Sequence, residues 1–426
     1  MPARTASGRA TRVRKRGRGR PRTGLALAGG GPLGGIYEVG ALLALTDSLD
    51  GIDFGDLDVY VGVSSGGFVA AALANGISPT QMYRLFIDDG ADAALTPGVF
   101  LRPALSEFAR RAASVPLLAL RATLQWMRDP FRHGLIESMA TLAHAVPTGL
   151  FDNRSIGNFL HHMFSAPGRT DDFRKLRRKL FLVATNLDTG ASVTFGTPAL
   201  DHVPISKAIE ASAALPGLFP PVRIGGEYYV DGALNKTLHA SVALDEGVDL
   251  LLCVNPLVPF DGSGAGKDGR LTVTKLSSGG LPLVLSQTFR AIIHSRMKVG
   301  MDSYRRQYPH ADVVLFEPDR EDADIFFASI FSYAQRKQLC AAAYQKTRQN
   351  LAARALVLAP KLATHGIALR TDRLADQGRD VTDALSDARP LHVGRRRANE
   401  VRQATRDLAH TLDHLERWLA RARSSG

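Results

Sequence analysis

The sequence has few cysteines and no long apolar run. Its two cysteines, Cys253 and Cys340, cannot build a disulfide framework, so we expect a chain that folds in a reducing compartment. No stretch approaches the roughly 20 uninterrupted apolar residues of a membrane-spanning helix, and no cleavable signal-peptide core follows the N-terminus. We therefore expect a protein of the cytoplasm or of a membrane surface. Nothing in the residue pattern suggests a metal site, and we expect no cofactor.

Acidic residues are missing from the first 23 residues. This segment holds nine lysines and arginines, most of the formal net charge of +12. Because it is basic and poor in apolar residues, we expect a disordered tail over residues 1–23. We consider three roles in order of preference: a solvated tail, contact with anionic lipid, and contact with DNA. The last rests on Arg18-Gly19-Arg20-Pro21, which resembles the core of an AT-hook.

From Thr23 onward, apolar runs alternate with amphipathic segments. We predict strands at 24–28 and 58–62 and helices at 36–49 and 65–75, the order typical of a parallel sheet covered by helices. The sequence therefore predicts an α/β fold. Further strands are predicted at 179–186, 192–196, 221–230 (a hairpin around Gly225-Gly226), 248–255 and 312–317.

Two regions have a helical pattern without strands. Residues 80–165 contain several amphipathic runs, which predict a helical insertion over one end of the sheet. Beyond about residue 345 the chain is helical and polar, and a weak heptad spacing from Val401 to Ala422 favours packing on the core over a coiled coil. We therefore predict one main domain over 24–345 and a helical C-terminal extension over 346–426.

A glycine-rich loop follows the first predicted strand. The segment LALAGGGPLGG, residues 25–35, has Gly29, Gly31 and Gly34 at the spacing of a dinucleotide-binding loop. Such a site needs an acidic residue at the end of the second strand, where it would hold the ribose. The aspartates at a suitable distance lie before that strand. The sequence therefore disfavours a nucleotide site and leaves the glycines for another task.

The second strand ends in a different motif. Residues 62–66, GVSSG, match G-x-S-x-G, in which a serine lies on a tight turn from a strand to a helix. Side chains two positions before and after that serine would collide, so Gly62 and Gly66 shape the turn. Ser64 has glycine at both positions, whereas Ser65 is preceded by Val63. We therefore predict Ser64 as a nucleophile.

An activated serine also needs donors for the oxyanion and a proton acceptor. Backbone N–H groups at the glycine loop, at the start of a helix, are suited to the first task. For the second, His202 and His239 are candidates, but we favour surface or packing roles for them. Asp231 ends a strand before Gly232 and could lie against Ser64. The predicted oxyanion donors are the N–H groups of Gly29, Gly30, Gly31, Gly34 and Ser65.

Together, three motifs resemble the patatin-like phospholipase family: GGGPLG at 29–34, GVSSG at 62–66 and DGA at 231–233. The segment ASAALPGLFPPV, 211–222, is similar to the one that precedes the family's aspartate. The resemblance covers about 24–240. It implies a three-layer α/β/α core with a mainly parallel sheet, and a Ser64–Asp231 dyad that hydrolyses acyl esters of lipids. Many members carry Arg or Lys where this chain has Leu33, so a cation is missing from that position.

The resemblance implies an enzyme of the phospholipase A or lysophospholipase type, with a lipid substrate at a membrane or micelle surface. The apolar residues of 80–165 then form an acyl pocket or a lid, or only additional core, and the pattern does not choose between them. The alternative function is a non-catalytic lipid-binding or nucleotide-binding protein of the same fold.

Overall fold

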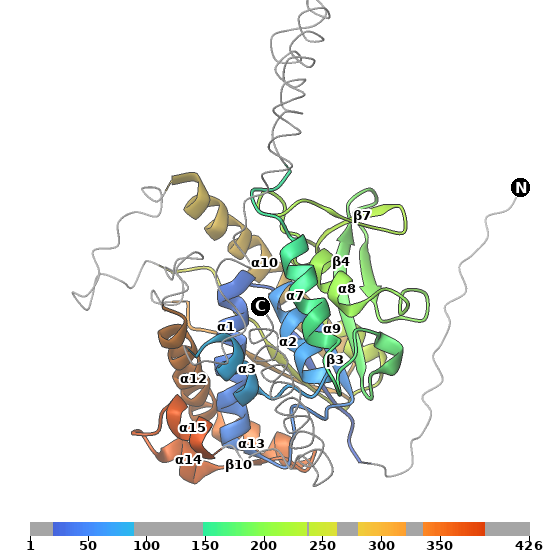
Figure 1. The fold of residues 1–426 in the computed structure, drawn as a ribbon. Helices are drawn as coiled ribbons and strands as arrows, with labels where there is room; N and C mark the ends of the chain where they lie inside the picture. The colour runs from blue at the N-terminus through green and yellow to red at the C-terminus, as the bar shows by residue number, and fades with distance from the viewer. Residues whose placement is uncertain (1–19, 89–147, 237, 262–279, 321–334, 388–426) are drawn as a thin grey trace, which may run out of the picture. The chain divides into compact units, whose positions relative to one another are not determined.

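The computed structural model describes residues 20–88, 148–236, 238–261, 280–320 and 335–387 (Figure 1). The predicted basic tail, most of the predicted insertion and the heptad segment lie outside these ranges. The chain divides into two compact units, Met1–Val381 and Thr382–Gly426, and the candidate site belongs to the first. No helix in the described ranges is both long and apolar enough to span a membrane.

One eight-stranded sheet organises the first unit. Its order is β6-β7-β4-β3-β1-β8-β9, and β5 pairs with β4. The run β4-β3-β1-β8-β9 is parallel, whereas β5, β6 and β7 are paired antiparallel. The strands are β1 Thr23–Leu27, β3 Val59–Val63, β4 Lys179–Asn186, β5 Ser192–Phe195, β6 Val222–Ile224, β7 Glu227–Asp231, β8 Leu250–Val254 and β9 Asp312–Phe316; β2 Leu49–Asp50 and β10 Ala368–Leu369 form a separate pair.

Helices connect the strands and cover the sheet. The described helices are α1 Gly31–Ser48, α2 Ser65–Ala74, α3 Pro79–Phe86, α7 Arg154–Phe164, α8 Ile205–Ser212, α9 Ala240–Asp245, α10 Gly280–Gln307, α12 Arg336–Ala353, α13 Ala355–Ala363, α14 Thr371–Ala375 and α15 Val381–Asp387, with single 3-10 turns at η1 Phe173–Lys175 and η2 Gly232–Leu234. The predicted α/β fold with a mainly parallel central sheet is confirmed. The predicted order of strands and helices from residue 23 to 75 is also observed.

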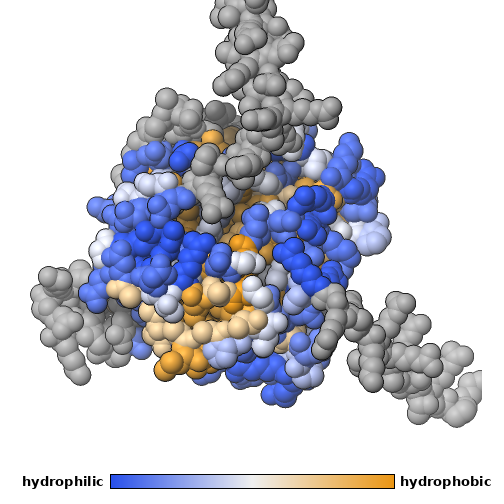
Figure 2. Space-filling view, turned by 90° about the horizontal axis from the view of Figure 1, so that it is seen from below, coloured by the Kyte–Doolittle hydropathy of each residue, from blue (hydrophilic) through white to orange (hydrophobic). Residues whose placement is uncertain are grey.

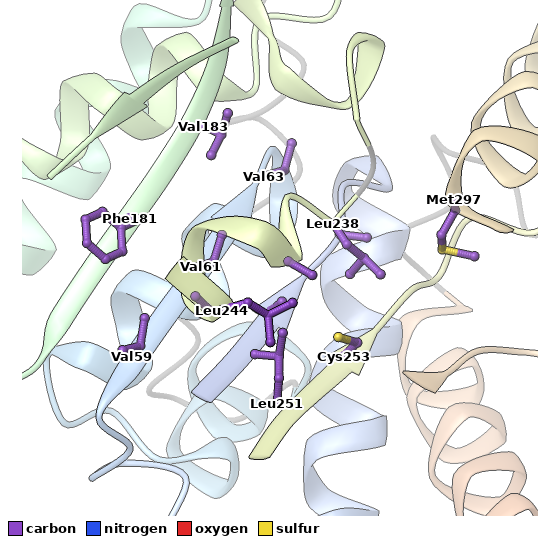
Figure 3. Packing of buried hydrophobic residues seen from close by; sticks show 14 of the residues in the cluster. Val59, Val61, Val63, Phe181, Val183, Leu238, Leu244, Leu251, Cys253 and Met297 are labelled. Atoms are coloured by element: carbon purple, nitrogen blue, oxygen red, sulfur yellow. The ribbon is translucent and has the colours of Figure 1, made fainter. Parts of the chain in front are cut away.

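Alternating side chains along β3 divide the core into two layers. Val59, Val61 and Val63 point to one face together with Leu244 of α9 (Figure 3), and Met297 of α10 belongs to the same buried cluster. The residues between them face α2, which packs on β1, β3 and β4. Burying one such aliphatic side chain stabilises the fold by about 1.5–3 kcal/mol. This alternation explains why the strands of this sheet are apolar on both faces.

Helix α1 begins at Gly31, five residues before the predicted start. Pro32 suits the first turn, because that turn has no use for its missing N–H. The helix is buried on nearly all sides, since α2 and α12 both pack on it. A Cβ atom at Gly40 would lie 2.4 Å from the carbonyl oxygen of Cys340. Glycine therefore sets how closely α1 and α12 can approach.

Residues 345–381 make several contacts within the first unit. Residue 345 itself lies inside α12, and β10 pairs with β2. Buried Asp47 of α1 accepts hydrogen bonds from Tyr344, Arg373 and Arg379. The first compact unit of the structure ends at Val381.

Candidate active site

Ser64 lies on the tight turn that joins β3 to α2. Its backbone has φ 54° and ψ −125°, a conformation that non-glycine residues rarely adopt. A Cβ at Gly62 would lie 2.5 Å from the carbonyl oxygen of Gly66, and one at Gly66 would lie 2.4 Å from that of Ala28. Such strained backbone costs on the order of 1–3 kcal/mol and is found mostly at functional sites. The two glycines are therefore required by the turn, as the motif predicted.

A second serine holds this turn in place. The Ser64 N–H donates to Ser212 Oγ at 2.8 Å, and Ser212 Oγ donates to the carbonyl oxygen of Val183 at 2.6 Å. Ser212 is fully buried at the end of α8. Sequence reasoning missed this residue, although it belongs to the segment 211–222 that resembled the family. Because its N–H is bound by Ser212, Ser64 itself does not supply an oxyanion donor.

Asp231 is the last residue of β7, which pairs with β4. In the sheet, β4 lies next to β3, the strand that leads into Ser64. The carboxylate of Asp231 accepts a hydrogen bond from the Ala233 N–H at 2.8 Å. Burial raises the pKa of Asp231 to about 6, although the Ala233 N–H and the nearby Ser64 hydroxyl lower it. The structure thus brings together the predicted nucleophile and the predicted base. A carboxylate with this pKa is ionised at neutral pH and still basic enough to accept a proton.

Two glycines allow the three motifs to meet. A Cβ at Gly232 would lie 2.3 Å from the carbonyl oxygen of Val183. A Cβ at Gly29 would lie 3.0 Å from Ser64 Cβ and 3.2 Å from Ala233 Cβ. The glycine loop, the serine turn and the aspartate turn therefore converge at a single point.

Two helix N-termini face this point. Helix α1 begins at Gly31 with Gly30 as its N-cap, and α2 begins at Ser65. The first N–H groups of a helix have no partner within it, and the helix dipole adds positive potential. The first turns of both helices lack acidic residues. Both ends can therefore stabilise a negative charge beside Ser64.

Gly34 differs from the prediction. Its N–H donates to the carbonyl oxygen of Gly30 at 3.0 Å, so this donor belongs to the first turn of α1 rather than to an oxyanion site. The missing side chain serves close packing instead. A Cβ there would lie 3.1 Å from both Pro256 Cγ and Ser65 Oγ.

Neither histidine candidate resembles a catalytic base. His202 is exposed on a loop. His239 is buried at the start of α9 with φ 44°, and its Nε2 lies 3.4 Å from the carbonyl oxygen of Gly232. Burial lowers the pKa of His239 to about 4, so the ring is neutral at physiological pH. His239 therefore packs behind the aspartate turn.

A small pocket lies beside the glycine loop. Gly30, Leu33 and Gly34 line one side, and Leu257 and Arg290 are among the residues that complete it. Burial lowers the pKa of Arg290 to about 10, which leaves the guanidinium charged at neutral pH. The loop lacks a cation at Leu33, as the sequence indicated, but α10 brings one to the same pocket.

A family model described as Patatin-like phospholipase matches residues 25–244, just over half of the chain. The structure of VipD from Legionella pneumophila is similar at 17% identity over 75% of this chain and 66% of that chain, with a TM-score of 0.31.

Two further solved structures contain the type III effector protein ExoU. One is similar at 16% identity over 77% of this chain and 52% of that chain, with a TM-score of 0.34. The other, a complex with SpcU from Pseudomonas aeruginosa, is similar at 16% identity over 77% of this chain and 53% of that chain, with a TM-score of 0.29. This chain spans from about half to two thirds of the length of the solved chains it matches.

Proposed function

The chain belongs to the patatin-like phospholipase family, as its three motifs predicted, and from this we propose that it is a serine acyl hydrolase acting on fatty acyl esters of lipids. The proposal includes phospholipase A and lysophospholipase reactions. The observation that carries it is the convergence of the strained Ser64 turn and the turn of the buried Asp231 at the glycine loop, where the Ser64 hydroxyl lowers the pKa of the Asp231 carboxyl. A binding site without catalysis does not require a strained backbone at a serine.

In the first half of the proposed reaction, Asp231 accepts the hydroxyl proton as Ser64 Oγ attacks the ester carbonyl carbon. The carbonyl oxygen becomes an oxyanion, which the N–H groups of Gly30, Gly31 and Ser65 stabilise together with the two helix dipoles. When the tetrahedral intermediate collapses, the bond to the alcohol breaks and Asp231 returns the proton to the departing alcohol. An acyl ester on Ser64 remains.

In the second half, Asp231 removes a proton from a water molecule that attacks the acyl carbon. The same N–H groups stabilise the second oxyanion. Collapse breaks the bond to Ser64 Oγ, which takes the proton back from Asp231, and the fatty acid leaves. No other base is required, because one carboxylate accepts and returns the proton in each half.

A fluorophosphonate probe tests the nucleophile directly. We expect the wild-type chain to be labelled and to hydrolyse a short-chain p-nitrophenyl ester, and Ser64→Ala to do neither. Ser192→Ala, which removes an exposed hydroxyl on β5, is the matched control and should behave like the wild type. Equal labelling of Ser64→Ala and wild type would overturn the assignment of Ser64. An unlabelled wild-type chain that still binds lipid would favour the non-catalytic alternative.

A further inference from the structure

Helix α10 exposes apolar side chains along one face. Phe289 is 45% exposed, Ile292 48% and Val299 68%. With Arg296 and Arg306 they follow the spacing of one helical face, three or four residues or a full seven apart. We call these five residues the outer face of α10.

The adjoining side of α10 already has its partner. Ile293, Met297 and Met301 recur every four residues and are buried, and the two methionines pack in the core cluster beneath the sheet (Figure 3). A helix that only covers a core is polar on its other side. The outer face of α10 exposes three large apolar side chains, and core packing does not explain them.

Positive charge accompanies this apolar stripe. Arg296, Lys298, Arg305 and Arg306 are exposed, whereas Asp302 is the only acidic residue of the helix. Apolar side chains flanked by lysine and arginine are typical of helices that lie in the interface of a membrane with anionic lipids. The complementary partner is therefore an apolar layer with a negatively charged rim.

The helix also lies against the candidate site (Figure 1). Arg296 donates to the carbonyl oxygens of Leu234 and Asn235 at 3.3 and 3.4 Å, directly after the turn that holds Asp231. One turn and a half earlier, Arg290 lines the pocket beside Gly30. A surface bound to the outer face of α10 would thus lie next to both halves of the site.

We propose that the outer face of α10 docks on the surface of an anionic lipid bilayer and so places the site at its substrate. The benefit of this docking rests on the proposed lipid hydrolase function, but the binding itself does not. Phe289, Ile292 and Val299 enter the boundary between headgroups and acyl chains, and the surrounding cations contact lipid phosphates.

Vesicle sedimentation measures this docking without hydrolysis if Ser64→Ala is the background. The vesicles contain equal parts of phosphatidylcholine and phosphatidylglycerol. We expect Phe289→Ser/Ile292→Ser/Val299→Ser to weaken binding at least about tenfold. These substitutions leave every charge in place, so the contribution of the basic residues 1–23 stays constant.

Leu356→Ser/Val357→Ser is the matched control. These side chains of α13 are 94% and 67% exposed. Helix α13 lies at the lower end of Figure 1, and Figure 2, seen from that side, shows an apolar patch framed by hydrophilic residues. We expect this variant to bind vesicles like its parent. Equal binding by the parent and the triple variant, or a loss confined to the α13 variant, would overturn the proposal.

Two further measurements keep the test independent of folding and of catalysis. Val299→Ser alone removes the most exposed side chain of the set and should weaken binding about threefold, in case the triple variant does not fold. Lys298→Gln/Arg306→Gln should weaken binding to the anionic vesicles about tenfold and leave binding to pure phosphatidylcholine unchanged. Vesicle binding that stays unchanged in either variant would contradict the proposal.

The soluble ester separates the two hypotheses. With Ser64 intact, the triple variant should hydrolyse a short-chain p-nitrophenyl ester at the wild-type rate, because it keeps Arg296, the outer-face residue that contacts the segment after the Asp231 turn. If no variant hydrolyses the ester, the proposed function fails while the vesicle result stands. If all hydrolyse it and vesicle binding is unchanged, only the docking proposal fails.

Discussion

The buried carboxylate of Asp231 links the site to pH. In the proposed mechanism only its ionised form accepts the Ser64 proton, and burial raises the pKa of Asp231 to about 6. We therefore expect kcat/KM on a soluble ester to rise with pH through a midpoint near 6 and then to level off. The raised pKa also means that the folded chain holds this proton more tightly than the unfolded chain. The contribution of the protonated Asp231 carboxyl to the free energy of unfolding consequently falls as pH rises toward 6.

A pH series on the wild type, with Asp231→Asn as the comparison, checks this behaviour. The asparagine variant should lose on the order of 10²–10⁴-fold in kcat, since its amide cannot accept the proton. A wild-type profile that stays flat from about pH 4 to 8 would mean that another group acts as the base.

Ser212 is expected to act as a positioning residue. Ser212→Ala leaves the Ser64 N–H and the carbonyl oxygen of Val183 without their buried partner, which costs about 1–3 kcal/mol of unfolding free energy for each group. Because the turn that carries the proposed nucleophile, Ser64, is no longer held, kcat should fall at least about tenfold while KM changes little.

Ser206 offers a control on the same helix. Its hydroxyl is also buried and donates to Asp171 at 2.7 Å, far along α8 from the turn. Ser206→Ala should lower the denaturation midpoint without lowering kcat. If the two variants lose stability and activity in the same proportion, Ser212 has only a structural role.

At the scale of elements, the crossing of α1 and α12 depends on a glycine. Gly40→Ala would place Cβ 2.4 Å from the Cys340 carbonyl oxygen and 2.9 Å from Ala343 Cβ. Neither backbone nor Cβ atoms can move aside cheaply, so we expect the free energy of unfolding to fall by about 1–3 kcal/mol.

Gly35 of the same helix is the matched control, measured by chemical denaturation. A Cβ there meets only Ser65 Cβ, at an ordinary 3.6 Å. Gly35→Ala should leave stability unchanged or raise it by up to about 1 kcal/mol through helix propensity. A larger loss for Gly35→Ala than for Gly40→Ala would contradict this account of the crossing.

At the scale of the whole molecule, the C-terminal segment completes the fold that carries the site. Truncation after residue 345 removes half of α12, the strand that pairs with β2, and both arginines bound to Asp47. Burial raises the pKa of Asp47, but the hydrogen bonds from Arg379, Tyr344 and Arg373 keep that pKa below its ordinary value. We expect the truncated chain to be unfolded, because the buried carboxylate of Asp47 would lose both of its arginine partners.

Truncation after residue 387 keeps all of these contacts and serves as the control. Far-UV circular dichroism compares the secondary structure of the two truncated chains, and thermal denaturation compares their stability. A cooperative transition in the chain that ends at 345 would show that the shorter domain folds alone. Loss of folding in the chain that ends at 387 would place the missing contacts beyond it.

The sequence by itself determined the α/β fold, the turn at Ser64 and the family. These are local properties: strand and helix periods, a turn that only glycine permits, and three motifs in a fixed order. The pairing of Ser64 with Asp231 was predicted from the family resemblance and from the strand that Asp231 ends. Spacing alone could not supply the burial that raises its pKa.

Only the tertiary structure decided what each site residue has as its neighbour. Gly34 donates within α1 rather than toward an oxyanion, because the helix begins earlier than its apolar pattern suggests. Ser212 reaches Ser64 across 148 positions of sequence, and α10 brings Arg290 to the pocket of Leu33. Contacts of this kind depend on which strands lie side by side. A single sequence records composition and period, but not which distant segments share a surface.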